Sequence, residues 1–201
     1  MSTSEISSTY EVLGVLGKPK DINAGLKELE NYITGRVDEI GRRLSRGSRS
    51  IFDFVDMAVL ISTLANMTDT SSKPDTDQYI DFVKCELLPS TESQKDLIAT
   101  SCYCLMRCGL IHEMSLEGHK IKGSRQKVIA GHSLSITHDK SKDNHWYSIE
   151  TKSKEIVFYA NELLAALRKC VGKCFDGKSC LWNAVQGKIA SPNGMRIIKV
   201  K

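Results

Sequence analysis

The sequence predicts a mainly α-helical fold, a helical bundle of about five helices with a small antiparallel β insertion. Several stretches repeat their apolar residues at intervals of three or four, as amphipathic helices do. One stretch is apolar on nearly every side, which is typical of the central helix of a bundle. Between the fourth and fifth helical stretches apolar and polar residues alternate instead, and this period of two predicts strands.

The first two helices follow an N-terminal arm, residues 1–22, which is Ser/Thr-rich over residues 1–9 and continues as "YEVLGVLGKPK", a short strand or a packed arm. The stripe of the first helix begins after Asn23, ends before "RGSRS" and consists of Leu26, Leu29, Ile33, Val37, Ile40 and Leu44. Ser50 and Asp53 have the spacing of a capping pair, so the second helix is expected to begin there and to include "IFDFVDMAVLISTLANM". This apolar helix is the one predicted to lie at the centre.

The third and fourth helices are separated by a proline. "QYIDFVKCELL" is expected to stop at Pro89, because proline cannot continue a helix. Ser90 or Ser93 is then expected to cap "SQKDLIATSCYCLMRCG", and Gly109 suits the end of this fourth helix.

The β insertion is expected at about residues 118–150, where "HSLSITH" and "HWYSIE" indicate an antiparallel sheet or hairpin. The helical period returns from Thr151 in "SKEIVFYANELLAALRKCV", the fifth helix. The expected organisation is a helical domain over residues 23–172, which contains the insertion, and a C-terminal extension over residues 173–201.

Composition places the chain among soluble globular proteins. Of its 201 residues 41% are hydrophobic and 26% are charged. No apolar run reaches the roughly 20 residues that span a bilayer, and the polar N-terminus lacks a signal pattern. We therefore expect a cytoplasmic protein that does not bind membranes, with its seven cysteines reduced. A net charge of +4 permits contact with nucleic acid without requiring it.

Metal and cofactor sites are not indicated. Cys170, Cys174 and Cys180 lack the tight CxxC spacing of zinc sites, and "GVLGKPK" lacks the spacing of a phosphate-binding loop. Cys108 and His112 would share a helical face as a thiol–imidazole pair, but no carboxylate that would orient the histidine is evident.

Arg107 and His112, in "RCGLIH", are the candidate catalytic residues. A purely structural interpretation is open, because an arginine near a helix C-terminus interacts favourably with the helix dipole. On an ideal α-helix, residues five apart point roughly 140° away from each other. The two residues therefore share a face only if the helix loosens near Gly109 or the site is completed from elsewhere.

"CYCLMRCGLIHEM" resembles the Arg-x4–6-His motif of the HEPN superfamily, the higher eukaryote and prokaryote nucleotide-binding domain. The resemblance implies a helical bundle that forms a homodimer, so that two motifs meet in one cleft. Many members are metal-independent endoribonucleases of toxin–antitoxin, phage-defence or RNA-processing systems, and others only bind RNA, nucleotide or protein. It implies that His112 acts as general base or acid and that Arg107 binds the phosphate, with neither metal nor cofactor. Active members often have a polar residue where this chain has Cys108.

Two basic segments are candidates for contact with an RNA backbone. Residues 118–138 contain no acidic residue but include Lys120, Lys122, Arg125 and Lys127. A second cluster surrounds the end of the first helix and consists of Arg36, Arg42, Arg43, Arg46 and Arg49. Both are also compatible with an ordinary solvated surface.

Two functions therefore remain open, together with an accidental motif. One is an endoribonuclease that cleaves RNA through attack by the 2′-hydroxyl, with an antitoxin or another protein as a further partner. The other is a non-catalytic module that binds RNA, nucleotide or protein. Ser101, Tyr103 and Glu113 lie close enough in sequence to assist the cleavage, and none of the three is singled out.

Overall fold

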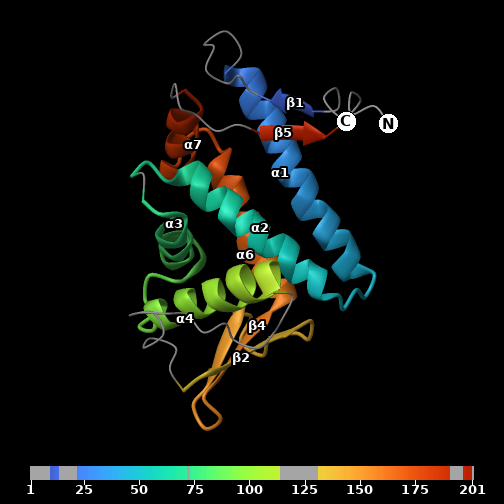
Figure 1. Cartoon of the computed structure of the whole chain (residues 1–201), viewed down its shortest axis with the longest axis vertical. Coiled ribbons are helices and arrows are strands. Elements are labelled where there is room, and N and C mark those ends of the chain that lie inside the picture. Colours follow the sequence, from blue (N-terminus) through green and yellow to red (C-terminus); the bar gives the residue numbers. More distant parts are fainter. Residues whose placement is uncertain (1–9, 14–21, 72, 114–130, 191–196, 201) are drawn as a thin grey trace, which may run out of the picture.

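The computed structural model of the chain is mainly helical with a small sheet, as predicted (Figure 1). The structure describes residues 10–13, 22–71, 73–113, 131–190 and 197–200. Within these ranges the α-helices are α1 (Ile22–Ser45), α2 (Ile51–Thr68), α3 (Asp75–Phe82), α4 (Lys95–Cys102), α6 (Ala160–Cys174) and α7 (Cys180–Ala190). Two π-helices are η2 (Val83–Leu87) and η3 (Tyr103–Glu113). The strands are β1 (Tyr10–Leu13), β2 (Ser133–Thr137), β3 (Tyr147–Glu150), β4 (Glu155–Tyr159) and β5 (Ile197–Val200).

The second helix, α2, lies at the centre, as predicted. It contacts α1, α3, η3, α6 and α7, and Figure 1 shows it crossing the middle of the bundle. Phe54, Met57, Ile61 and Leu64 are fully buried along it. By length and composition alone α2 would also suit a membrane span, but half of it is buried inside the structure, and core helices of soluble proteins pass the same test.

The first helix has the predicted buried stripe. Leu29, Ile33 and Ile40 are fully buried, and Leu44 packs against the core from the end of the helix. The stripe faces α6 and α2, so α1 and α6 flank the central helix.

The connection into the fourth helix differs from the prediction. The third helix winds as a π-helix from Val83 before it stops ahead of Pro89. Neither predicted serine caps α4, whose N-cap residue is Gln94. The helix has no side-chain cap, and Glu92 Oε1 accepts the backbone N–H of Gln94 itself at 2.8 Å.

The three-stranded sheet is mixed rather than antiparallel. Its order is β2-β4-β3, with β2 parallel and β3 antiparallel to β4. The middle strand, β4, occupies residues that we expected to begin the fifth helix, and α6 starts only at Ala160. Ile156 and Phe158 are fully buried while their neighbours are half-buried, so "EIVFY" has the alternation of a strand as well as apolar residues at helical spacing.

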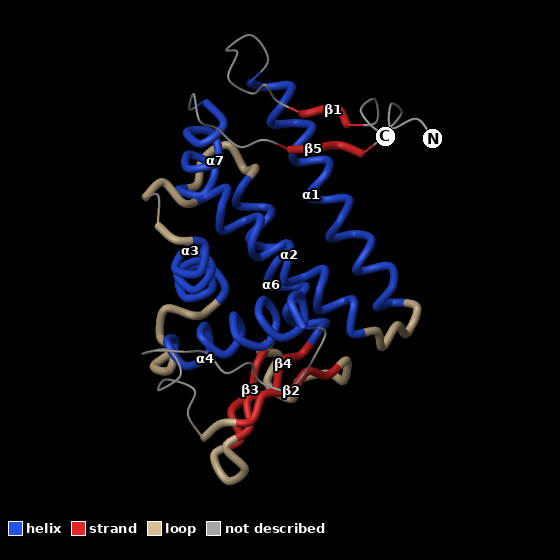
Figure 2. The backbone as a smooth tube through the Cα atoms, in the orientation of Figure 1, coloured by secondary structure: helices blue, strands red, loops and turns tan. Residues whose placement is uncertain are grey.

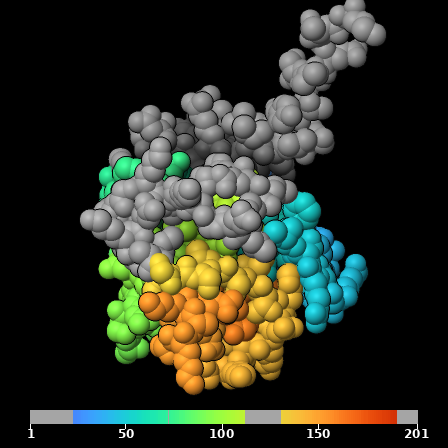
Figure 3. All heavy atoms as spheres, turned by 60° about the horizontal axis from the view of Figure 1, so that its bottom comes forward, coloured from blue at the N-terminus to red at the C-terminus, as the bar shows by residue number. Residues whose placement is uncertain are grey.

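The sheet lies at one end of the molecule, next to the helices (Figure 2). In the space-filling view its orange side chains form the lower part of one face, between residues of the α1–α2 connection and the green α3–α4 region (Figure 3). The helices α4 and α6 both contact β4.

The C-terminal part of the chain returns to the bundle. Leu181, Val185 and Ile189 of α7 are buried in the same core as α2 and α6. Near the two ends of the chain, β1 and β5 pair antiparallel, with Tyr10 opposite Val200. This pair lies at the opposite end of the molecule from the three-stranded sheet (Figure 1).

Candidate functional site

The candidate motif lies on η3, which continues α4 without a break. The helix does not end at Gly109, as we expected, but runs on to Glu113. Gly109 and Leu110 are buried, and η3 packs along α2, so the helix is held by the core on both sides of the glycine. Residues Arg107 and His112 therefore belong to one helical segment.

The π-helical winding changes the relation between residues five apart. Each backbone N–H bonds to the carbonyl five residues earlier, so a turn contains about 4.4 residues instead of 3.6. Backbone positions 107 and 112 are then roughly 50° apart around the axis and one turn apart along it. On an α-helix the same two positions would be roughly 140° apart. The helix is therefore wound more loosely around Gly109, which is one of the two conditions for Arg107 and His112 to share a face.

Arg107 is half-buried and lies in an aromatic environment. Its positive charge interacts with the side chains of Tyr79 and Tyr103, whose rings meet edge to face at 5.4 Å. The Tyr103 hydroxyl shares a hydrogen bond of 2.9 Å with the Thr76 hydroxyl, which ties the start of η3 to α3.

Both tyrosines remain neutral near Arg107. Burial raises the pKa of Tyr79 well above its ordinary value, although the charge of Arg107 acts in the opposite direction. Burial also raises the pKa of Tyr103, with Thr76 and Arg107 opposing it. The phenols therefore offer hydroxyl donors and no negative charge at neutral pH. Among described residues, no carboxylate forms an ion pair with Arg107.

The cysteines of this region differ in burial, and the Cys108–His112 pair stays a prediction because the His112 side chain lies outside the described residues. Cys102 is fully buried, and its burial raises the pKa of the thiol to about 12. Cys108 is half-buried and interacts with the Tyr103 hydroxyl. In the part of the chain that the structure describes, no group of His, Cys, Asp and Glu side chains has the arrangement of a metal site.

The arginine cluster at the end of α1 is largely engaged in ion pairs. Arg43 Nε donates to Asp53 Oδ1 at 2.8 Å, and its Nη2 donates to Asp56 Oδ2 at 2.5 Å. Arg36 Nη2 reaches Asp56 Oδ1 at 2.9 Å. Arg42 pairs with Glu39, and Arg49 lies 3.6 Å from Asp139. These pairs neutralise much of the positive charge available to an RNA backbone.

Asp53 is the fully buried centre of this cluster. Besides Arg43 it accepts a hydrogen bond from the Ser48 hydroxyl at 2.7 Å, and His138 Nε2 lies 3.4 Å from its Oδ2 without a hydrogen-bond partner. His138 also meets Phe54 edge to face at 5.3 Å. Burial alone would lower the pKa of Arg43, but the hydrogen bonds to Asp56 and Asp53 outweigh it and raise the pKa. Asp53 therefore joins α1, α2 and the sheet rather than capping α2, whose cap is Ser50.

The remaining predicted site residues lie outside the described residues. These are Lys120, Lys122, Arg125 and Lys127, and the side chain of His112. The structure adds Tyr79 to the surroundings of Arg107, together with Thr76, which shares a hydrogen bond with Tyr103. Tyr103 was already a candidate from its position four residues before Arg107, whereas nothing in the sequence connects Thr76 or Tyr79 with the motif.

Comparison with known proteins gives no assignment: no protein-family model, no curated protein and no solved structure matches the chain.

Proposed function

We propose that the chain is a cytoplasmic, metal-independent endoribonuclease of the HEPN-like type, with Arg107 and His112 as its catalytic residues. One observation carries the proposal. The π-helical register of η3 places backbone positions 107 and 112 on nearly the same side of one helix, where an α-helical register would separate them.

The proposed reaction uses the nucleophile that RNA itself provides. The 2′-hydroxyl oxygen attacks the adjacent phosphorus, the P–O5′ bond breaks, and the products are a 2′,3′-cyclic phosphate and a free 5′-hydroxyl. One imidazole accepts the proton of the 2′-hydroxyl, and an imidazolium donates a proton to the departing O5′. Arg107 neutralises the charge that builds up on the phosphate oxygens in the transition state.

The surroundings of Arg107 support a role in phosphate binding. The guanidinium is half-buried beside two neutral phenols, so its charge is less screened by water than that of a fully exposed arginine. The hydrogen bond between Tyr103 and Thr76 fixes the helix that carries it. We propose further that Lys120, Lys122, Arg125 and Lys127 contact the RNA backbone.

A homodimer would bring two such motifs together. Acid–base catalysis with one type of histidine needs one neutral and one protonated imidazole, and two copies of His112 would supply both. We propose further that an antitoxin or another protein binds the chain, as part of a toxin–antitoxin or phage-defence system.

The test compares cleavage of RNA by the wild type and four variants in the presence of EDTA. We expect cleavage by the wild type and a loss of 10²–10⁴-fold in His112→Ala, the usual cost of removing a general acid or base. Arg107→Ala should lose activity as well. Arg168→Ala and His132→Gln are the matched controls, because these residues lie on α6 and before β2, and both should retain activity. Cleavage that survives in His112→Ala would contradict the proposal.

A non-catalytic RNA-binding module is the second candidate, and Cys108 favours it. The thiol occupies the position after Arg107 and contacts Tyr103, where active proteins with this motif often have a polar residue. In that case the same RNA should remain intact in EDTA, while binding weakens with salt and with Arg107→Ala.

A further inference from the structure

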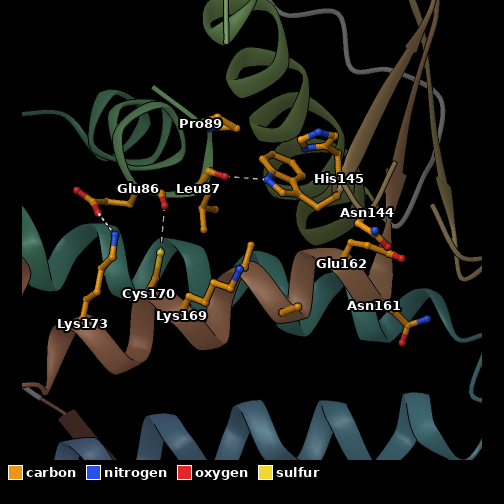
Figure 4. A pocket seen from close by; sticks show the side chains of 13 residues that line it. Glu86, Leu87, Pro89, Asn144, His145, Asn161, Glu162, Lys169, Cys170 and Lys173 are labelled. Carbon is orange, nitrogen blue, oxygen red and sulfur yellow. Dashed lines mark hydrogen bonds and ion pairs between the residues drawn. The ribbon is translucent and has the colours of Figure 1, made fainter. Parts of the chain in front are cut away.

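A second site, away from η3, is a pocket of about 520 Å³ between α6, the end of η2 and the segment that precedes β3 (Figure 4). Its volume falls within the roughly 300–1,000 Å³ of small-molecule sites. The hollow exists because Ala165 and Ala166 present only methyl groups on the side of α6 that faces Leu87 and Trp146.

The walls of this pocket are fixed by hydrogen bonds and packing. Trp146 is buried, its Nε1 donates to the Leu87 carbonyl at 2.9 Å, and its ring stacks on Phe158 with the centroids 5.8 Å apart. On α6, the Cys170 thiol donates to the Glu86 carbonyl at 3.3 Å. The first hydrogen bond joins the segment before β3 to η2, and the second joins α6 to η2. The apolar walls are therefore held in place without a ligand.

Among the described residues, Lys169 is the lysine of this pocket that has no ion-pair partner. Figure 4 shows its side chain extending from α6 along the pocket, between Cys170 and Glu162. Within the described part of the chain, no carboxylate forms an ion pair with Lys169, whereas Lys173 lies 3.8 Å from Glu86. Glu162 Oε1 accepts the Ser141 backbone N–H at 3.1 Å, whereas its buried Oε2 has no hydrogen-bond partner among the described residues.

We propose that this pocket binds a planar aromatic molecule that carries an anionic group, with the ring against Trp146, Leu87 and the two alanines and the anion on Lys169. An apolar wall favours the ring by burial of its surface. The free ammonium gives the anion a charge-assisted hydrogen bond. Two carboxylates line the pocket as well: Glu86 lies 3.8 Å from Lys173, and Glu162 lies toward the β3 side. The adjoining hollow is lined by Glu92, Asp143 and Glu150. The anion is therefore assigned to Lys169, the lysine of the pocket that has no carboxylate partner among the described residues.

Isothermal titration calorimetry on the full chain tests the proposal with two probes. Adenosine monophosphate represents a nucleotide and 2-naphthoate represents an aromatic acid, and both combine a planar ring with an anion. We expect saturable binding of at least one probe at a stoichiometry of one, and the probe that binds identifies the source of the ligand.

Three variants locate the binding. Lys169→Gln should weaken it about tenfold or more, because it removes the charged donor. Arg168→Gln is the matched control with the same change of charge, since Arg168 faces Asp38 on the α1 side of α6, and binding should be unchanged. Ala165→Phe should abolish binding by filling the pocket from an exposed position on α6. Binding of neither probe, or binding that Lys169→Gln and Arg168→Gln weaken equally, would overturn the proposal. None of these outcomes depends on Arg107 or His112.

Discussion

Replacing Asp53 with alanine removes the buried centre of the polar cluster that joins α1, α2 and the sheet. Asp53 is fully buried and accepts hydrogen bonds from Arg43 at 2.8 Å and from Ser48 at 2.7 Å. Hydrogen bonds to a charged group contribute about 1.5–3 kcal/mol each. The Arg43 side chain is 31% exposed and keeps Asp56 as a partner, so its share falls at the lower end of that range. We therefore expect Asp53→Ala to lower the free energy of unfolding by about 3 kcal/mol.

Urea denaturation and thermal melting measure this loss. For a chain of this size about 3 kcal/mol corresponds to a fall in Tm of roughly 6–12 °C. Asp38→Ala is the matched control, because Asp38 is 61% exposed and lies 3.7 Å from Arg168. This surface pair should contribute less than about 1 kcal/mol. Equal losses in the two variants would refute the role assigned to Asp53.

Three further predictions follow from burial and hydrogen bonding. Tyr147→Phe removes the hydroxyl that donates to Glu92 and lowers the pKa of that carboxyl, so the variant should be less stable than the wild type at pH 7. Because the folded-state pKa is lowered, this difference should shrink as the pH falls below about 4, which denaturation at several pH values will show. Leu60→Ala should cost about 2–5 kcal/mol in urea unfolding, whereas Val59→Ala, at an exposed position one residue away, should cost less than about 1 kcal/mol. Alkylation at pH 8, followed by mass spectrometry, should modify the exposed thiols of Cys85 and Cys180 first. Buried thiols whose pKa is raised to about 12 should react only after unfolding; these are Cys102, Cys170 and Cys174.

The helices were predictable where one face alone is buried. The stripe from Leu26 to Ile40 specifies α1 because each member meets the core at helical spacing. The boundary between β4 and α6 could not be predicted from the sequence. Ile156, Phe158 and Ala160 continue an apolar pattern that fits both the period of a strand and that of a helix. The parallel pairing of β2 with β4 depends on where the intervening β3 hairpin packs, which local sequence does not encode.

The candidate site was predictable in its residues but not in its geometry. Arg107 and His112 stand out by type and spacing, yet Gly109 between them suggested the end of a helix. Whether a helix adopts the i→i+5 register depends on how α2 and α3 pack along η3, and this packing is a tertiary property. The pocket beside Lys169 likewise depends on two alanines that no sequence pattern marks.

The proposed ribonuclease activity depends most on the convergence of Arg107 and His112 on one phosphodiester. NMR titration of the labelled protein with an oligonucleotide whose 2′-hydroxyls are absent, and which therefore cannot be cleaved by the proposed reaction, tests this directly. If both side chains bind one phosphodiester, the Arg107 guanidinium and His112 imidazole resonances should shift together, with one saturation midpoint. Arg107→Ala should then abolish the shift of the His112 resonance. Saturable binding that leaves both resonances unmoved would contradict it.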